Sequence, residues 1–215
     1  MEESGNQESI TIPAGSVRLG GLLGIPEKSN SIVIFAHGSG SGRFSSRNNY
    51  VAEALRRANL STLLFDLLTE SEDMDYEKRF DIPLLSKRLV ETTKWIAERR
   101  ETRSFRIGYF GASTGAAAAL EASTFFPPSS IAAIVSRGGR PDMAMHHLKK
   151  VNSPTLLIVG GNDEEVIQLN KIAYEQLSCE KRLAIVPGAT HLFEEPGTLE
   201  EVSRLAIDWF SMHMK

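Results

Sequence analysis

The strongest chemical signal in the sequence is the segment Gly111-Ala112-Ser113-Thr114-Gly115, a G-x-S-x-G motif. It follows the apolar run 106–110 and precedes the alanine-rich run 116–119, so a strand, a sharp turn and a helix are expected in that order. Such a turn exposes the serine hydroxyl as a nucleophile, and the flanking glycines leave room where a Cβ would clash. The alternative is a small-residue turn that only packs a helix on a strand. The strand–turn–helix setting favours Ser113 as the nucleophile.

A serine hydroxyl is a poor nucleophile without a base, and His191 is the best placed of the five histidines. It lies in the loop between the last apolar run, 182–186, and the final helical pattern. The alternative is a loop histidine bonded to the backbone. His146 and His147 are adjacent on a predicted helix and point about 100° apart, so they cannot both face one site. His213 lies in the terminal tail.

The base needs a carboxylate that fixes its tautomer and stabilises the imidazolium. Asp163 follows the apolar run 154–159 through three turn residues, Gly160-Gly161-Asn162. Its neighbours Glu164 and Glu165 are alternatives, although in the first turn of a helix they only complement the helix dipole. A capping role for Asp163 is a further alternative. The position directly after the glycine turn favours Asp163.

The oxyanion of a tetrahedral intermediate needs preset hydrogen-bond donors. The segment 37–42, here called the oxyanion loop, has the sequence His-Gly-Ser-Gly-Ser-Gly and follows the apolar run 31–36. Its small residues leave backbone N–H groups exposed. We expect the amide of Ser39 and the amide of Thr114, directly after the nucleophile, to form the oxyanion hole. Gly40 is a candidate for contact with the substrate.

Other polar residues near this edge have weaker claims. The oxyanion loop is not a phosphate-binding loop, because it lacks the Gly-Lys-Ser/Thr ending, and Arg43 replaces the third glycine of a dinucleotide-binding motif. We expect His37 to hold the loop through a ring hydrogen bond. Arg137 and Arg140 are candidates for a clamp on a substrate carboxylate. An exposed loop, or pairing with Asp142, is the favoured alternative for both arginines.

These residues must be positioned by a particular set of elements. Two strands, 8–13 and 17–25, are predicted first, with Gly15 between them where a tight turn needs a positive φ. Six short apolar runs follow, and their lack of alternation is typical of strands buried on both faces of a parallel sheet. These runs are 31–36, 61–65, 106–110, 131–136, 154–159 and 182–186. The pattern predicts an α/β fold, one domain over residues 1–215, with about eight mostly parallel strands and helices on both faces.

Helical patterns separate the apolar runs. Apolar residues at helical spacing are Val51, Ala54, Leu55 and Ala58, then Ile82, Leu85, Leu89 and Ile96, and finally Val202, Leu205, Ala206, Trp209 and Phe210. Thr198 and Glu201 predict a capping box at the start of the last helix. A further helix is predicted around 146–150. The segment 69–81 is predicted to be a polar loop, and its acidic part, 70–77, a solvated surface.

Composition and charge exclude several classes of protein. Lys and Arg number 24 against 27 Asp and Glu, a net charge of −3, so no basic surface for nucleic acid or anionic lipid is indicated. The uncharged stretches are too short to span a membrane, and the acidic start, residues 1–6, is unlike a signal peptide. Cys179 is the only cysteine, which excludes an internal disulfide and indicates a small buried apolar residue. We expect a cytoplasmic protein that needs no metal.

The sequence resembles the α/β-hydrolases, and among them the small lid-less group that is similar to dienelactone hydrolases. The resemblance covers about residues 10–210 and depends on four segments in the right order, 35–42, 111–115, 159–163 and 188–193. It implies that Ser113 is the nucleophile, Asp163 the acid and His191 the base. Dienelactone hydrolases proper carry a cysteine nucleophile. The serine here favours ordinary ester or thioester chemistry.

The resemblance further implies a carboxylesterase that works through an acyl-enzyme and needs no organic cofactor. Only residues 137–153 separate two predicted strands where many relatives insert a lid, so we expect no cap domain and an open site for short-chain or small soluble esters. Thioesterase, lactonase, acyltransferase or perhydrolase chemistry with the same triad is the alternative. A non-catalytic binding module is the rival from another class. We expect a monomer or homodimer, with activity that rises with pH as His191 loses its proton.

Overall fold

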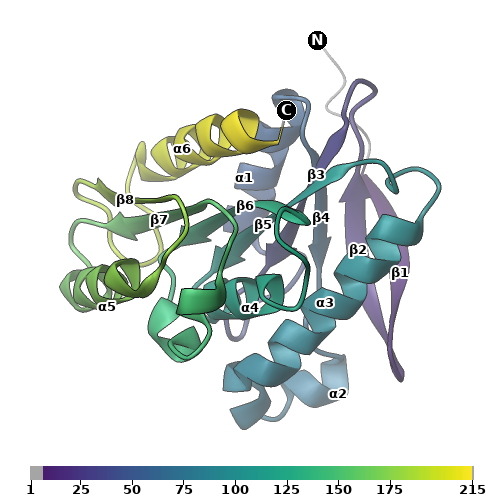
Figure 1. The fold of residues 1–215 in the computed structure, drawn as a ribbon, viewed down its shortest axis with the longest axis horizontal. Helices are drawn as coiled ribbons and strands as arrows, with labels where there is room; N and C mark the ends of the chain where they lie inside the picture. The colour runs from purple at the N-terminus through teal and green to yellow at the C-terminus, as the bar shows by residue number, and fades with distance from the viewer. Residues whose placement is uncertain (1–6, 215) are drawn as a thin grey trace.

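The computed structural model describes residues 7–214, whose strands form a single eight-stranded sheet (Figure 1). The strands are β1 (Gln7–Ala14), β2 (Val17–Gly24), β3 (Ser31–Ala36), β4 (Ser61–Phe65), β5 (Arg106–Ala112), β6 (Ile131–Arg137), β7 (Thr155–Gly160) and β8 (Lys181–Val186). Their order across the sheet is β1-β2-β4-β3-β5-β6-β7-β8. Pairing is antiparallel between β1 and β2 and between β2 and β4, and parallel elsewhere. The predicted sheet is confirmed, and no strand end differs from its prediction by more than two residues.

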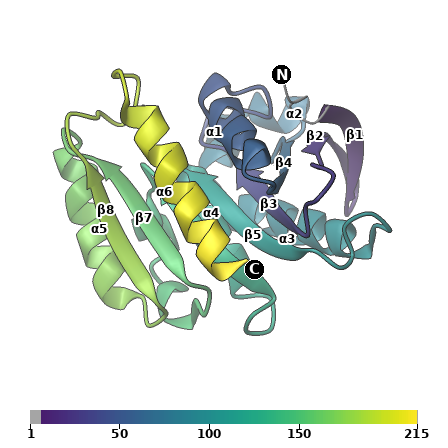
Figure 2. The ribbon, with the colours of Figure 1, turned by 90° about the horizontal axis from the view of Figure 1, so that it is seen from above.

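Helices cover both faces of the sheet, as predicted (Figure 2). The α-helices are α1 (Ser46–Arg57), α2 (Glu70–Asp73), α3 (Ile82–Glu98), α4 (Thr114–Ser123), α5 (Glu164–Gln176) and α6 (Thr198–His213), and the 3-10 helices are η1 (Glu77–Phe80), η2 (Pro141–Ala144) and η3 (Leu148–Lys150). The helices α1 and α6 pack on one face, and α3, α4 and α5 pack on the other. No cap domain is inserted among the described residues.

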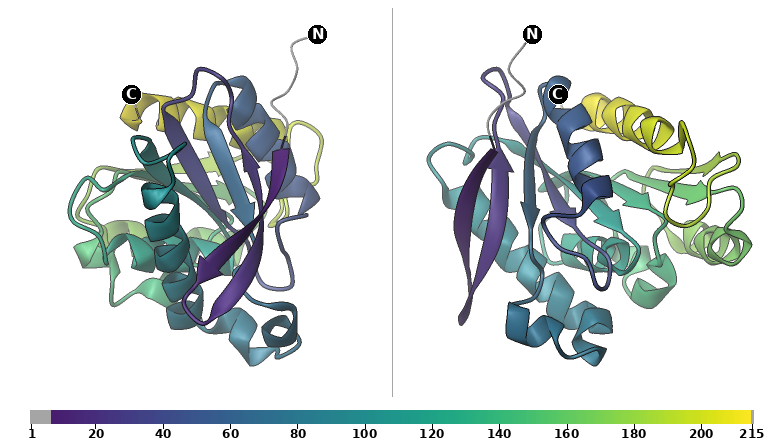
Figure 3. Two further views of the ribbon diagram at one scale, coloured as in Figure 1. Left: turned by 90° about the vertical axis from the view of Figure 1, so that its right-hand side faces the viewer. Right: turned by 180° about the vertical axis from the view of Figure 1, so that it is seen from behind.

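The inner strands are buried on both faces, which explains their continuous apolar sequences. In β3, Val33 and Phe35 join the core under α1 and α6, whereas Ile32 and Ile34 join the core under α3 and α4. The β1–β2 hairpin closes one edge of the sheet and β8 the other (Figure 3). The hairpin turn has Gly15 at φ 63°, as predicted. Since the parallel strands share one direction, the loops after their carboxyl ends meet at one edge, where α/β folds place their sites.

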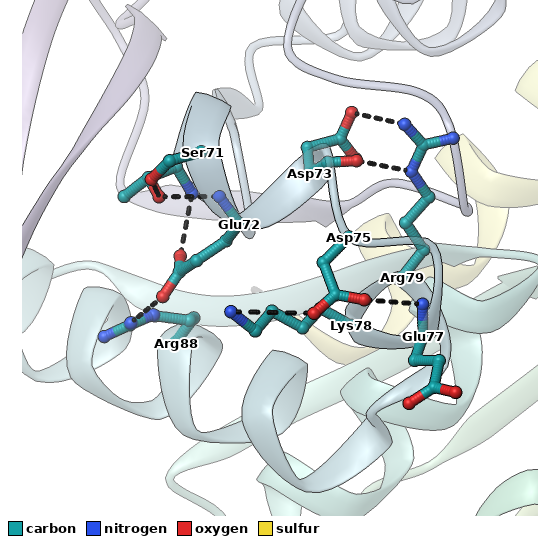
Figure 4. Close-up of polar contacts among 9 residues, drawn as sticks. Ser71, Glu72, Asp73, Asp75, Glu77, Lys78, Arg79 and Arg88 are labelled. Atoms are coloured by element: carbon teal, nitrogen blue, oxygen red, sulfur yellow. Dashed lines mark hydrogen bonds and ion pairs between the residues drawn. The ribbon is translucent and has the colours of Figure 1, made fainter.

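The prediction that segment 69–81 is a polar loop is wrong, because this segment contains α2 and η1. Thr69 begins α2 with a capping box: its hydroxyl accepts from the Glu72 N–H, and the Glu72 carboxylate accepts from the Thr69 N–H. The same carboxylate binds the buried Arg88 of α3 at 2.9 Å (Figure 4). Burial alone would raise the pKa of Glu72, but the bonds from Thr69 and Arg88 lower it overall. Glu72 therefore ties α2 to α3, whereas Glu70, Asp75 and Glu77 are exposed, as expected of a solvated surface.

The predicted capping box of the last helix is also wrong. Gly197, with φ 83°, occupies the N-cap position of α6, and Thr198 is the first helical residue. The Thr198 hydroxyl donates to the Glu195 carbonyl at 2.7 Å instead of accepting from the helix. Glu201 pairs with Arg204 one turn later. The helix therefore begins from a glycine in the left-handed conformation, which offers no side chain for capping.

The helix predicted around 146–150 is present only as the short 3-10 helix η3, and a second 3-10 helix, η2, precedes it between β6 and β7. Their hydrogen bonds join the carbonyl of residue i to the N–H of residue i+3, as in η3 between the His147 carbonyl and the Lys150 N–H at 2.8 Å. His146 is exposed, and His147 lies 3.8 Å from Glu121 of α4. The two histidines still do not face one site.

Among the residues that the structure describes, no helix is long and apolar enough to cross a membrane. The acidic start, residues 1–6, on which the signal-peptide expectation depends, lies outside the described residues.

Candidate active site

Ser113 lies on a sharp turn between β5 and α4. Its backbone has φ 50° and ψ −121°, a conformation that non-glycine residues rarely adopt and that costs about 1–3 kcal/mol. The flanking glycines make this turn possible. A Cβ on Gly111 would lie 2.4 Å from the Ala116 Cα, and a Cβ on Gly115 would lie 2.1 Å from the Ala36 carbonyl oxygen. The clash expected at both glycines is present, and the turn holds Ser113 at the carboxyl end of β5.

His191 and Asp163 are in direct hydrogen-bond contact. The imidazole Nδ1 lies 2.7 Å from the Asp163 Oδ2. Asp163 occupies the N-cap position of α5 but its side chain makes no capping bond, so the carboxylate is available to the imidazole. Glu164 and Glu165, the alternatives, are exposed in the first turn of α5. An imidazole held through Nδ1 presents Nε2 as the proton acceptor.

The turn at residues 137–140 connects Ser113 to the histidine. The Ser113 N–H donates to the Arg137 carbonyl at 3.3 Å, and the Arg140 N–H donates to the Ser113 carbonyl at 3.1 Å. Gly138, with φ 51°, lies against the other partner: a Cβ there would be 3.1 Å from the His191 carbonyl oxygen and 3.6 Å from its Cε1. Ser113 and His191 therefore pack against the same short turn.

The oxyanion loop is fixed by the ring of His37. The His37 Nε2 accepts from the Leu67 N–H at 3.0 Å, so the Nδ1–H donates to the Gly38 carbonyl at 2.9 Å. Burial of the ring lowers the pKa of His37, which keeps it neutral. The structure thus gives His37 the loop-holding contacts that the sequence predicts. Gly38 lies beside the nucleophile, since a Cβ there would be 3.1 Å from the Ser113 Cβ.

The two predicted donor residues flank this contact. Thr114 is the first residue of α4, directly after Ser113, and its amide lies at the helix N-terminus. Ser39 is exposed and follows Gly38 in the oxyanion loop. Gly40, the next residue, is exposed and has φ 65°. Arg43, just beyond the loop, donates its N–H to the Asp66 carboxylate at 2.8 Å and pairs with it through its guanidinium, which ties the loop to the end of β4.

A small cavity of about 10 Å³ lies beside the oxyanion loop, room for the centre of about one water molecule. Its lining consists of His37, Gly38, Ser39, Gly40, Leu67, Leu68, Asp73, Arg79, Leu85 and Thr114. Arg79 donates to the Asp73 carbonyl at 2.8 Å and to its carboxylate at 3.1 Å (Figure 4). Sequence reasoning missed this wall, because it treated 69–81 as a solvated loop; the Thr69-x-x-Glu72 capping signal could have found it.

The two arginines proposed for a carboxylate clamp have different environments. Arg140 pairs with Asp142 through two bonds of 2.9 and 2.8 Å, the favoured alternative, and these bonds raise its pKa. Arg137 is neither in a loop nor exposed, because it is the last residue of β6 and only 5% of its surface is accessible. Its guanidinium donates to the Asn48 Oδ1 at 3.0 Å. The structure therefore does not bring the two guanidinium groups together as a clamp.

Remaining candidate groups lie outside this cluster. His213 lies 3.6 Å from Glu180 in the C-terminal part of the chain. Cys179 is half-buried with its Sγ 3.7 Å from the Thr155 hydroxyl, and burial raises the pKa of its thiol. Within residues 7–214, no group of three or more His, Cys, Asp or Glu side chains is arranged to hold a metal ion.

Comparisons with known proteins identify the family and the fold of this chain. A family profile described as an alpha/beta hydrolase domain matches residues 29–208. The crystal structure of a dienelactone hydrolase from Anabaena variabilis ATCC 29413 is 50% identical, with a TM-score of 0.96 over 99% of this chain and 100% of that chain. A Xanthomonas campestris structure described as an a/b serine hydrolase without lid is 18% identical, with a TM-score of 0.79 over 97% of this chain and 95% of that one. At that identity, it shows similarity of fold alone.

A curated relative is more than twice as long. It is the "Putative phosphoribosyl transferase" of Mycobacterium tuberculosis (strain CDC 1551 / Oshkosh), 54% identical over 207 residues. The match covers 96% of this chain and 46% of that protein. This chain thus spans about half the length of the curated relatives it matches.

Proposed function

Because the chain belongs to the alpha/beta hydrolase domain family, we propose that it is a serine hydrolase that cleaves carboxylic esters through an acyl-enzyme. The observation that carries the proposal is the 2.7 Å contact between His191 Nδ1 and Asp163, on a segment packed against the same turn as Ser113. Asp163 supplies a carboxylate, His191 an imidazole and Ser113 a hydroxyl on a strained turn. These three groups are the parts of a catalytic triad.

Each residue has a defined step in the proposed mechanism. His191 Nε2 takes the proton of the Ser113 hydroxyl as its oxygen attacks the ester carbonyl, and Asp163 stabilises the resulting imidazolium. The amides of Ser39 and Thr114 hold the oxyanion of the tetrahedral intermediate. That intermediate collapses as His191 gives its proton to the leaving alcohol, which leaves an acyl-enzyme on Ser113. His191 then deprotonates a water molecule, whose attack releases the carboxylic acid and restores the serine.

The substrates proposed for this site are short-chain or small soluble esters. The small cavity beside the oxyanion loop, whose lining includes Thr114 directly after Ser113 and the apolar Leu67 and Leu85, supports a small acyl group. No cap domain covers the site among the described residues, so large alcohol groups extend into solvent. A series of nitrophenyl esters from acetate to decanoate tests this, and a rate that increases up to decanoate would contradict it.

The nucleophile is tested by covalent labelling and by one substitution. A fluorophosphonate is expected to label the wild-type chain at Ser113, and Ser113→Ala is expected to remain folded and lose nearly all turnover of nitrophenyl acetate. Labelling elsewhere, or retained turnover in the variant, would remove Ser113 from the mechanism. A folded wild-type chain that is not labelled would favour the rival hypothesis of a non-catalytic binding module.

Other acyl-transfer reactions of the same triad remain alternatives to ester hydrolysis. Acyl-thioesters, lactones, acceptor alcohols and hydrogen peroxide, supplied in competition with nitrophenyl acetate, distinguish thioesterase, lactonase, acyltransferase and perhydrolase activity. A higher kcat/KM for any of these than for the best ester would replace the ester proposal. A cytoplasmic location and a monomeric or homodimeric state stay predictions.

The transferase name of the curated relative applies to a protein twice as long as this chain. We assign hydrolase chemistry to the matched half, because that half contains the counterpart of nearly this whole chain, and we attribute phosphoribosyl transfer to the remainder of that protein. An assay of this chain for transfer from an activated ribose phosphate to a nucleobase tests the division. Transfer by the chain alone would overturn it.

A further inference from the structure

Arg137 is a buried cation without an acidic partner. Strand alternation places its side chain, like those of Ala133 and Val135, on the face that α1 and α6 cover. No carboxylate of the described residues lies within 4.0 Å of its guanidinium; Nη2 donates to Asn48 and the buried Nε has no partner. Burial and the nearby charge of Arg47 lower its pKa to about 10. An apolar side chain of the same length would cost less to bury, so the charge calls for a functional explanation.

The guanidinium lies under the segment that carries the catalytic base. Its Cζ is 5.9 Å from the centre of the Phe193 ring, which is fully buried and belongs to the residue two positions after His191. Phe193 has φ 56°, a strained conformation that persists only when surrounding contacts hold it. The segment 187–197 is neither helix nor strand, so turn hydrogen bonds and side-chain contacts, rather than a regular element, hold His191 in place.

The backbone at the same position reaches the nucleophile. The Arg137 carbonyl accepts from the Ser113 N–H, and a Cβ built on the adjacent Gly138 would lie 3.1 Å from the His191 carbonyl oxygen and 3.5 Å from the Phe193 ring. Arg137 and Gly138 therefore contact two parts of the site. Their backbone reaches the nucleophile, and they also pack against the segment that carries His191. The Arg137 side chain thus lies against the histidine segment through Phe193, whereas the bond to Ser113 involves only the Arg137 backbone.

We infer that Arg137 is a positioning residue: fixed by Asn48, it supports the Phe193 ring and so holds His191 at the separation from Ser113 that proton transfer requires. The inference rests on the proposed function. This role would explain why a charged side chain is buried at position 137. Cation–π attraction supplies a modest directional force, and a misplacement of about 1 Å at a reacting group can cost about 100-fold in rate.

Arg137→Met is the main test, and Arg56→Met is its matched control. Arg56 is also a buried arginine without an acidic partner among residues 7–214: it donates to one side chain, Thr62 Oγ1, at 2.9 Å, and its Nε is unpartnered. Arg56 is near the end of α1 and contacts the start of β4. This is the amino-terminal end of the parallel strands, opposite the carboxyl ends that carry the site. Both variants are expected to melt at or above the wild-type temperature, because each removes a buried charge.

Only Arg137→Met is expected to slow chemistry. Its kcat for nitrophenyl acetate and its rate of fluorophosphonate labelling should fall together by about 10- to 100-fold, with KM within twofold of wild type. Phe193→Leu should reproduce the loss, and the double variant should be no slower than the worse single variant, because both changes release the same contact. Arg137→Lys should retain part of the rate, since it keeps the charge.

The outcomes separate this inference from the proposed function. If the wild-type chain is labelled at Ser113 and Arg137→Met is labelled at the same rate, the positioning role is wrong while the triad stands. A lower melting temperature with unchanged kcat would assign Arg137 a structural role only. If wild-type Ser113 is not labelled, the triad itself is wrong. If Arg137→Met does not fold, wild-type rates in both Arg137→Lys and Phe193→Leu would equally overturn the inference.

Discussion

A methyl group at Gly115 would enter the junction between β3 and the oxyanion loop. In Gly115→Ala, the new Cβ would lie 2.1 Å from the Ala36 carbonyl oxygen and 2.5 Å from that of His37, whereas real Cβ atoms essentially never approach closer than 3.0 Å. Both opposing atoms are backbone, so no side-chain rotation relieves the overlap. Either α4 or the start of the oxyanion loop must move by about 0.9 Å to reach the 3.0 Å limit.

That displacement sets the expected magnitudes. Overpacking of a filled interior costs about 1–3 kcal/mol, so the free energy of unfolding should fall by this amount. The displaced atoms lie between Ser113 and the oxyanion loop, and a shift of about 1 Å among reacting groups can cost about 100-fold. We therefore expect kcat/KM for nitrophenyl acetate to fall roughly 100-fold, about 2.7 kcal/mol of transition-state stabilisation.

Urea unfolding and ester turnover of the same preparation measure both effects. Gly197→Ala is the control: Gly197 has φ 83° but an added Cβ meets nothing within 4 Å, so the variant carries backbone strain of about 1 kcal/mol without a clash. It should lose stability and keep its turnover within twofold. The steric reasoning is refuted if Gly115→Ala turns over ester at the wild-type rate, or if Gly115→Ala unfolds at the same urea concentration as the wild-type chain.

Three further changes test separate parts of the site. Asp163→Asn should remain folded and lose about 10⁴-fold in kcat, because the imidazole loses its orienting carboxylate, while Glu164→Gln should behave as wild type; equal losses in the two would refute the choice between them. Leu85→Ala should cost about 2–5 kcal/mol in urea unfolding and raise turnover of hexanoate relative to acetate, because Leu85 is buried and lines the small cavity; an unchanged ratio would place the acyl group elsewhere. Burial lowers the pKa of folded His37 below the value of about 6.5 expected when unfolded, so the unfolded state binds more protons and stability should fall below about pH 6.5, by up to about 1.4 kcal/mol for each pH unit. Urea unfolding at pH 5 and 7 should show a smaller difference in His37→Asn, and an equal difference would contradict the assignment.

Much of the site follows from the sequence because parallel strands impose a common direction. Once the apolar runs are assigned to such strands, Ser113, Asp163 and His191 each follow a strand end, and all must reach one edge of the sheet. The G-x-S-x-G turn adds a steric requirement that only glycine satisfies, at Gly111 and Gly115. These constraints are local or topological, and neither depends on the detailed packing of side chains.

The sequence-based predictions are wrong at positions where side-chain packing determines the local structure. The apolar run predicts a strand that ends at Ser136 and leaves Arg137 in the following loop, although the alternation of Ala133 and Val135 continues to Arg137. A charged residue normally ends a buried strand. Nothing in the neighbouring sequence indicates that the Arg137 guanidinium donates a hydrogen bond to Asn48. The predicted capping box of the last helix is wrong for a related reason. The Thr198 hydroxyl can donate as well as accept a hydrogen bond, and it donates to the Glu195 carbonyl.

The backbone of Ser113 links activity to an energetic burden. A side chain at φ 50° raises the energy of the folded chain whether or not substrate is present, and glycine would adopt the same angles freely. Selection for thermal stability alone would therefore favour glycine at position 113, and the hydroxyl would be lost. Under the proposed function, this strain is a cost of presenting the nucleophile, and substitutions that stabilise the chain without loss of turnover must lie at other positions.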